Sequence, residues 1–151
     1  MKEINENIWN IYKNYDAIVC PTNGVVKKNG ELVMGGGLAL QFKKRFPYIP
    51  FIWGQKVDLL GNHLSKYSHD KSDLPVLISF PSKHHWKDKS DINLIKRSLN
   101  ELMKCVEEEN YKKILLPKVG CGLGGLLWKD IKHIISEQLD DRYTVISNDD
   151  P

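Results

Sequence analysis

Four short apolar runs divide the chain. They occupy residues 16–21, 74–81, 113–117 and 143–147, and proline or polar residues bound each of them. Runs of four to eight apolar residues are typical of buried strands, and continuous rather than alternating hydrophobicity indicates a strand that is covered on both faces. The pattern therefore predicts four strands of a buried sheet.

Helical periodicity fills the segments between these runs. Residues 92–106 carry Ile, Leu and Val at spacings of three and four, and Ser90 is placed to cap that helix. A second helix is predicted from the glycine run at 35–37 until Pro47 stops it, and a third is predicted over 128–139.

Two segments carry weaker signals. Residues from about 50 to 60 fit one more helix, whereas residues 64–73 are too polar to assign. Strands that alternate with helices indicate an α/β domain of three layers, α/β/α, around a mixed, largely parallel central sheet. A length of 151 residues fits one such domain, and we expect residues 1–151 to form it.

Composition excludes several classes of protein. Hydrophobic residues at 41% and charged residues at 27% fit a globular chain rather than a disordered one, and no run reaches the roughly 18 apolar residues of a membrane helix. Residues 1–10 lack the basic start and apolar core of a signal peptide, and three cysteines are too few for a disulfide framework. We expect a cytoplasmic monomer with no membrane partner.

Charge is unevenly distributed along the chain. Residues 1–100 hold 15 basic and 9 acidic side chains, a net charge of +6, and residues 101–151 hold 7 and 10, a net charge of −3. The surplus suits an anionic ligand, yet it lacks the dense Lys and Arg clustering that by itself would predict a nucleic-acid-binding protein.

The segment from Lys118 to Trp128 holds four glycines in six positions, between a predicted strand and a predicted helix. Glycines let backbone amides converge without Cβ obstruction, and a helix N-terminus adds partial positive charge, so the segment has the chemistry of a phosphate-binding loop. It lacks the Lys-Ser or Lys-Thr of a Walker motif, and too little chain follows it for the second half of a dinucleotide-binding fold.

Another glycine-bearing loop spans residues 21–37, again between a strand and a helix. In chain order, residues 21–37 are the first glycine loop and residues 118–128 are the second. Two such loops at one edge of a sheet would hold a ligand with more than one phosphate, and Asn23 can offer its amide to a sugar hydroxyl. A diphosphate between two sugars fits these requirements.

Together the two loops resemble those of the macrodomains, a family that binds ADP-ribose. The resemblance covers nearly the whole chain and is strongest to the bacterial and phage branch related to the DarG antitoxin macrodomain and to the terminal ADP-ribose protein glycohydrolase. It implies an α/β/α macrodomain that removes ADP-ribose, or a group on its distal ribose, from a conjugate. The ligand-binding residues that it implies are Asn7, Ile8, Asn23, Gly35, Gly36, Gly37, Gly120, Cys121, Gly122, Leu123, Gly124 and Gly125.

The resemblance also implies catalytic residues. The run Phe-Pro-Ser-Lys-His-His-Trp at 80–86 is similar to a DarG segment that carries a catalytic lysine. It therefore implies a catalytic role for Lys83, with Asn23 and His84 as further candidates. The Lys83 amine would attack the opened distal ribose or polarise the leaving group, and a histidine can relay a proton near neutral pH.

Two positions depart from the family pattern. The usual Gly-Asp start appears here as Glu6-Asn7, so an amide oxygen replaces the carboxylate that accepts a hydrogen bond from adenine. An aspartate in the second glycine loop of the terminal glycohydrolase corresponds to Gly124, so a mechanism that pairs a lysine with an aspartate does not carry over intact.

Several alternatives stay open at this point. Macrodomains include binders without activity, so a non-catalytic reader of ADP-ribose and a phosphatase acting on ADP-ribose 1″-phosphate are both compatible with the loops. Protein, DNA and metabolite conjugates are all possible substrates. Cys121, beside a helix N-terminus, is a weaker candidate nucleophile. The histidines lack the spacing of a zinc site, and we expect no metal and no cofactor.

Overall fold

The computed structural model describes residues 1–70 and 72–148. Within them lie strands β1 (Lys2–Asn5), β2 (Ala17–Thr22), β3 (Ser65–Tyr67), β4 (Val76–Pro81), β5 (Ile114–Pro117) and β6 (Tyr143–Ser147). They form a six-stranded sheet in the order β1-β6-β5-β2-β4-β3. Neighbouring strands are parallel except for β3, which runs antiparallel to β4, so the mixed, largely parallel sheet is confirmed.

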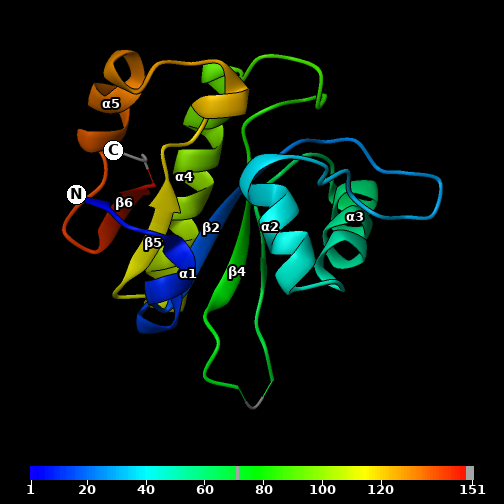
Figure 1. The fold of residues 1–151 in the computed structure, drawn as a ribbon, viewed down its shortest axis with the longest axis horizontal. Coiled ribbons are helices and arrows are strands. Elements are labelled where there is room, and N and C mark those ends of the chain that lie inside the picture. The colour runs from blue at the N-terminus through cyan, green and yellow to red at the C-terminus, as the bar shows by residue number, and fades with distance from the viewer. Residues whose placement is uncertain (71, 149–151) are drawn as a thin grey trace.

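Helices cover both faces of this sheet (Figure 1). Among the described residues they are α1 (Ile8–Ile11), α2 (Gly37–Arg45), α3 (Ile49–Leu60), α4 (Ile92–Glu109) and α5 (Trp128–Ser136). One core cluster joins the sheet to α4 and α5, and a second joins it to α1, α2 and α3. The three layers expected from the sequence are therefore confirmed. None of the helices in residues 1–70 and 72–148 is both long and apolar enough to cross a membrane.

Alternation along each strand divides the core into these two clusters. Successive residues of a strand point to opposite faces of the sheet. In β2, Ala17 and Val19 belong to the cluster with α4 and α5, whereas Ile18 and Cys20 belong to the cluster with the other three helices. All four side chains are fully buried. The run is continuously apolar because both faces of its strand are covered.

Two strands have no counterpart in the sequence-based expectations. β1 and β3 lie at the two edges of the sheet, and their side chains are exposed or half-buried. Their polar sequences, Lys-Glu-Ile-Asn and Ser-Lys-Tyr, therefore carry no strand signal. β3 falls in the unassigned segment 64–73, of which residue 71 lies outside the described residues. The other expected elements are found within three residues of their predicted ends.

The cap of α4 is Asp91 rather than Ser90. The Asp91 Oδ1 accepts hydrogen bonds from the N–H groups of Asn93 (2.8 Å) and Leu94 (3.3 Å). Ser90 lies under the second glycine loop instead, where its N–H donates to the carbonyl of Gly124 over 2.8 Å. The prediction of Ser90 as the cap was wrong because both residues are good caps and tertiary contact decides between them.

The carboxyl ends of β2, β4 and β5 meet at one edge of the sheet because the three strands are parallel. The loops that follow them gather at the top of the view in Figure 1. In α/β sheets, ligands bind at this edge.

Gly54 allows the loop between β2 and α2 to lie against α3. A Cβ at this buried position would stand 2.0 Å from the carbonyl oxygen of Gly30 and 2.8 Å from the backbone nitrogen of Leu32. We expect Gly54→Ala to lower the free energy of unfolding by about 2 kcal/mol, because overpacking outweighs the better helix propensity of alanine. Thermal unfolding followed by circular dichroism should show a midpoint lower by ~4–8 °C. Gly35→Ala is the control, because a Cβ there meets nothing within 4 Å; equal shifts would contradict the explanation.

Candidate functional site

A cavity of about 790 Å³ opens between the loops that follow β2, β4 and β5. This volume is in the range of pockets that hold small ligands. Both glycine loops line it, so the structure brings together the two segments that the sequence singled out. The predicted residues among its lining are Asn23, Gly35, Gly36, Gly37, Lys83, Gly120, Cys121, Gly122, Leu123 and Gly124.

The first glycine loop presents the N-terminus of α2 to the cavity. The first N–H groups of an α-helix have no acceptor within the helix, and Gly36, the N-cap residue of α2, has no side chain that could accept from them. Together with the helix dipole they favour a bound anion. Asn23 shapes this loop: its Nδ2 donates to the carbonyl of Val33, and its Oδ1 accepts from the N–H of Val25, both over 2.9 Å.

The second glycine loop reaches across the cavity to the first. Gly120 and Gly122 have φ angles of +79° and +66°, in the left-handed region that favours glycine. The resulting turn carries Leu123, which is 74% exposed. The Leu123 Cδ1 lies 3.1 Å from the place where a Cβ of Gly36 would stand. The two loops thus approach each other over the cavity, and bulk at Gly36 would narrow the gap.

Lys83 follows β4 on a backbone that is held from two sides. Its N–H donates to the carbonyl of Thr22 over 3.3 Å, and its own carbonyl accepts a 3.0 Å hydrogen bond from Nδ2 of Asn62. The Lys83 Nζ donates to the carbonyl of Leu123 over 3.1 Å. The amine therefore extends from the β4 side of the cavity to the second glycine loop.

Asn62 is a supporting residue that sequence reasoning missed. The Nη2 of Arg97 in α4 donates to the Asn62 carbonyl, and the Arg97 Nε lies 3.3 Å from Oε1 of Glu101. α4 thereby fixes Asn62, and Asn62 fixes the backbone of Lys83. Asn62 stands in a polar stretch between α3 and β3, and only the tertiary fold brings it to Lys83, so no spacing in the sequence signals its role.

Gly124 leaves no room for a side chain. A Cβ there would lie 2.3 Å from Oγ of Ser90 and 4.0 Å from Cε of Lys83. Ser90 is 8% exposed, and among the described residues its hydroxyl has no hydrogen-bond partner. The structure gives a physical reason for the departure noted at this position: the space that an aspartate side chain would need is filled by Ser90.

His84 is turned away from the cavity. Its Nε2 donates to Oδ2 of Asp91 over 3.0 Å, and the residue is absent from the described lining of the cavity. The hydrogen bond from His84, followed by those from backbone N–H groups of α4, holds the pKa of Asp91 below its ordinary value. The structure thus places His84 in a contact that ties the segment after β4 to the start of α4.

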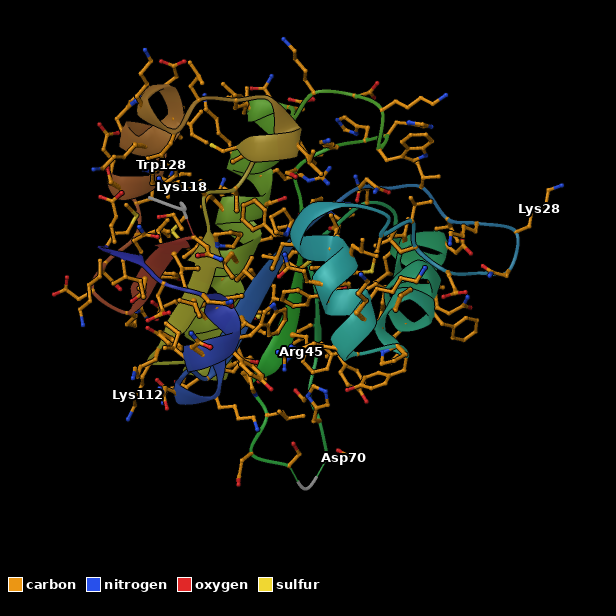
Figure 2. The ribbon with its side chains drawn as sticks, in the orientation of Figure 1. Lys28, Arg45, Asp70, Lys112, Lys118 and Trp128 are labelled. Carbon is orange, nitrogen blue, oxygen red and sulfur yellow. The ribbon has the colours of Figure 1, made fainter. Side chains whose placement is uncertain are left out.

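The electrostatics of the cavity suit an anion. Its described lining includes Lys83 and Lys118 but no Asp or Glu. The Lys118 Nζ lies 5.8 Å from the ring centroid of Trp128, and Figure 2 shows the two residues close together. Burial raises the pKa of the Cys121 thiol, which disfavours the thiolate that a nucleophile requires. In residues 1–70 and 72–148, no group of three His, Cys, Asp or Glu side chains could hold a metal ion.

Three predicted ligand contacts lie outside the described cavity lining. The Asn7 Oδ1 caps α1 by accepting from the N–H of Trp9 over 3.0 Å, and Ile8 is buried in the core beside it. Both residues follow β1 and so lie at the same edge of the sheet as the cavity. In the strand order, β1 is four strands away from β4, and neighbouring strands are ~4.8 Å apart. Gly125 ends the turn of the second loop and lies beside Lys89.

Comparison with known proteins identifies the family. A family model described as the Macro domain matches residues 25–135, a range that includes Lys83 and the second glycine loop. The chain belongs to the macrodomain family. The macrodomain of Thermus aquaticus DarG shares its fold, with a TM-score of 0.79 and 28% sequence identity over 99% of this chain and 97% of that one.

Two further comparisons concern longer proteins. The "DNA ADP-ribosyl glycohydrolase" of Mycobacterium bovis is 34% identical over 144 residues, which are 89% of this macrodomain and 41% of that protein. A structure of Thermosipho africanus DarTG in complex with ADP-ribose has a TM-score of 0.74 and 25% identity, covering 87% of this chain and 38% of that one. The resemblance to the DarG branch is thus confirmed, and this macrodomain spans less than half the length of the curated glycohydrolase.

Proposed function

We propose that this macrodomain binds ADP-ribosylated DNA and hydrolyses the bond at C1″ of the distal ribose, releasing ADP-ribose, and that residues 1–151 act as a single domain. The observation that carries the proposal is the placement of Lys83, which lines the cavity together with the two glycine loops and whose amine donates to the Leu123 carbonyl. The names of the relatives, DNA ADP-ribosyl glycohydrolases, support DNA as the conjugate.

The proposed ligand lies along the carboxyl edge of the sheet. Its diphosphate sits between the glycine loops, where the N-terminus of α2 and the loop amides favour negative charge. Its adenine points toward β1, where Asn7 follows the strand, and its distal ribose points toward β4 and Lys83. An elongated ligand with two sugars fits that separation better than a mononucleotide does.

The proposed hydrolysis exchanges one bond for another at C1″. The bond from C1″ to the acceptor atom of DNA breaks, and the acceptor leaves with the electron pair and takes up a proton. Water forms the new bond to C1″ and gives up a proton. Because positive charge develops on the sugar in the transition state, a group positioned at this carbon controls the rate. Lys83 either donates a hydrogen bond to the leaving atom or adds to C1″ of the opened sugar before water displaces it.

A panel of conjugates tests this function. The protein is incubated with ADP-ribosylated single-stranded DNA, with ADP-ribosylated protein and with ADP-ribose 1″-phosphate, and the products are separated by chromatography. We expect free ADP-ribose from the DNA conjugate, at a higher rate than from the protein conjugate, and no inorganic phosphate. Release from protein alone would overturn DNA as the substrate, phosphate release would favour the phosphatase, and binding without release would favour the reader.

Asn7 provides a test of the orientation of the ligand. Asn7→Ala should weaken ADP-ribose binding by about 1 kcal/mol, the value of one hydrogen bond to adenine, and should leave the affinity for ribose 5-phosphate unchanged. Because Asn7 also caps α1, Asn7→Asp is the matched control, since a carboxylate keeps both the cap and the acceptor. Calorimetry measures the affinities of both ligands for the wild type and for the two variants. Equal losses for the two ligands in Asn7→Ala would show that the residue acts only through the fold.

A further inference from the structure

Trp86 is an exposed indole at the mouth of the cavity. It is 48% exposed, yet it is among the residues that line the cavity, together with Lys83 on the same loop. A tryptophan that leaves half of its surface in water gives up much of the stabilisation that burial would bring. Packing of the hydrophobic core therefore does not explain why a tryptophan stands at this position.

A tight turn holds this indole in place. The N–H of Asp88 donates to the carbonyl of His85 over 3.0 Å, and the N–H of Lys87 donates to Nδ1 of the His85 ring over 3.1 Å. The His85 and Trp86 rings lie 5.3 Å apart with an interplanar angle of 30°. The indole thus stands on an ordered turn, with its plane supported by its neighbours along the chain.

Positive charge surrounds the indole. Residues 83–89 hold three lysines and one aspartate, a net charge of +2. The Lys87 Nζ lies 5.1 Å from the Trp86 ring centroid, and the Lys89 side chain runs beside the second glycine loop, 3.4 Å from the place where a Cβ of Gly125 would stand. An exposed cation–π contact is worth ~0.5–1 kcal/mol, whereas a nucleobase stacked on an aromatic side chain is worth ~1–3 kcal/mol. A nucleobase can therefore replace the Lys87 ammonium group on the Trp86 ring. The displaced ammonium group can then pair with a phosphate of the strand.

We propose that Trp86, Lys87 and Lys89 bind the single-stranded DNA from which ADP-ribose is removed: a base next to the modified nucleotide stacks on the indole, and the flanking phosphates pair with the two lysines. This inference rests on the proposed function, which places the distal ribose beside Lys83, so that the attached strand leaves the cavity past Trp86. An aromatic platform flanked by cations is the combination that binds single strands without regard to sequence.

Kinetics on two ligands test the surface. Trp86→Ala should raise KM for ADP-ribosylated single-stranded DNA about tenfold, as expected for the loss of one stacked base, while the affinity for free ADP-ribose changes less than twofold. Trp86→Phe should restore most of the loss, because it keeps an aromatic face. Leu59→Ala is the matched control: Leu59 is 78% exposed on α3, outside the described lining of the cavity, and both constants should stay unchanged.

Binding of unmodified DNA tests the surface separately from the reaction. The probe is a short fluorescein-labelled single-stranded DNA, followed by anisotropy at several salt concentrations. Lys87→Ala and Lys89→Ala should each reduce the slope of log K against log salt concentration by about 0.7, and Trp86→Ala should weaken binding without changing that slope. This result can hold even if the wild-type protein releases no ADP-ribose, so failure of the proposed function and failure of this surface are distinguishable.

Three outcomes would overturn the proposal. The first is an unchanged KM for the DNA conjugate in Trp86→Ala together with unchanged binding of the fluorescein-labelled strand. The second is an equal loss of affinity for free ADP-ribose, which would make Trp86 part of the ADP-ribose pocket. The third is an equal loss on an ADP-ribosylated peptide, which would assign this surface to a protein partner.

Discussion

Lys83→Ala is expected to lower the turnover of ADP-ribosylated DNA by about a hundredfold or more, while the affinity for ADP-ribose changes by no more than a few-fold. The Lys83 Nζ donates to the carbonyl of Leu123 from outside the loop, so we expect both glycine loops to stay in place when the amine is removed. A group that acts in the transition state affects rate rather than ground-state binding, and a hundredfold corresponds to ~2.7 kcal/mol. Single-turnover rates and calorimetry measure the two quantities.

Two variants sharpen this result. Lys83→Arg should not restore the rate, because a guanidinium is neither deprotonated nor nucleophilic at working pH. A partial recovery would instead favour a lysine that only donates a hydrogen bond to the leaving atom. Lys104→Ala removes a lysine that is 77% exposed on α4 and lies outside the described lining of the cavity, so its rate should equal that of the wild type. Full activity in Lys83→Ala would remove this residue from the mechanism.

Gly36→Val is expected to weaken ADP-ribose binding at least a hundredfold without unfolding the protein. Gly36 has an extended backbone with φ of −152°, which valine adopts readily, and the new Cβ would point across the gap at Leu123 Cδ1, 3.1 Å away. The side chain would therefore occupy the space between the two loops, where the diphosphate is proposed to lie. Calorimetry with ADP-ribose and a thermal unfolding curve check the two parts of the expectation.

A second substitution separates blockage from distortion. Leu123→Ala widens the same gap, so the double variant Gly36→Val/Leu123→Ala should recover part of the lost affinity. Gly124 is a poorer position for such a test, because any Cβ there would displace Ser90 and disturb the start of α4. No recovery in the double variant, or unchanged affinity in Gly36→Val, would place the phosphates elsewhere.

The central strands could be predicted because their chemistry is unambiguous. Ile18 and Val19 are buried on opposite faces of the sheet, each beneath a layer of helices. A strand covered on both faces needs apolar residues at every position, so a continuous apolar run predicts it. The strands β1 and β3 could not be predicted, because they lie at the edges of the sheet that the described residues form and their side chains are polar and partly exposed. β1 and β3 form by backbone pairing with β6 and β4, and their own side chains carry no pattern that predicts this pairing.

The glycine loops of the site could also be predicted, since glycine density next to a strand and a helix has few explanations. The contacts that set the orientation of Lys83 could not, because Asn62 comes from a polar stretch and Ser90 was interpreted as a helix cap. His84 illustrates the limit of adjacency in sequence: it neighbours Lys83, yet its ring contacts Asp91 instead of the cavity. The catalytic role predicted for His84 stays a prediction.

The most direct test of the account is a single-turnover time course with the protein in excess over single-stranded DNA that carries one ADP-ribose. The oligonucleotide and the released nucleotide are separated at each time point and identified by mass spectrometry. The account predicts that the modified strand disappears as unmodified strand and free ADP-ribose appear together in equal amounts, and that Lys83→Ala slows both by the same factor. A modified strand that stays intact while bound to the protein would contradict hydrolysis and identify a reader.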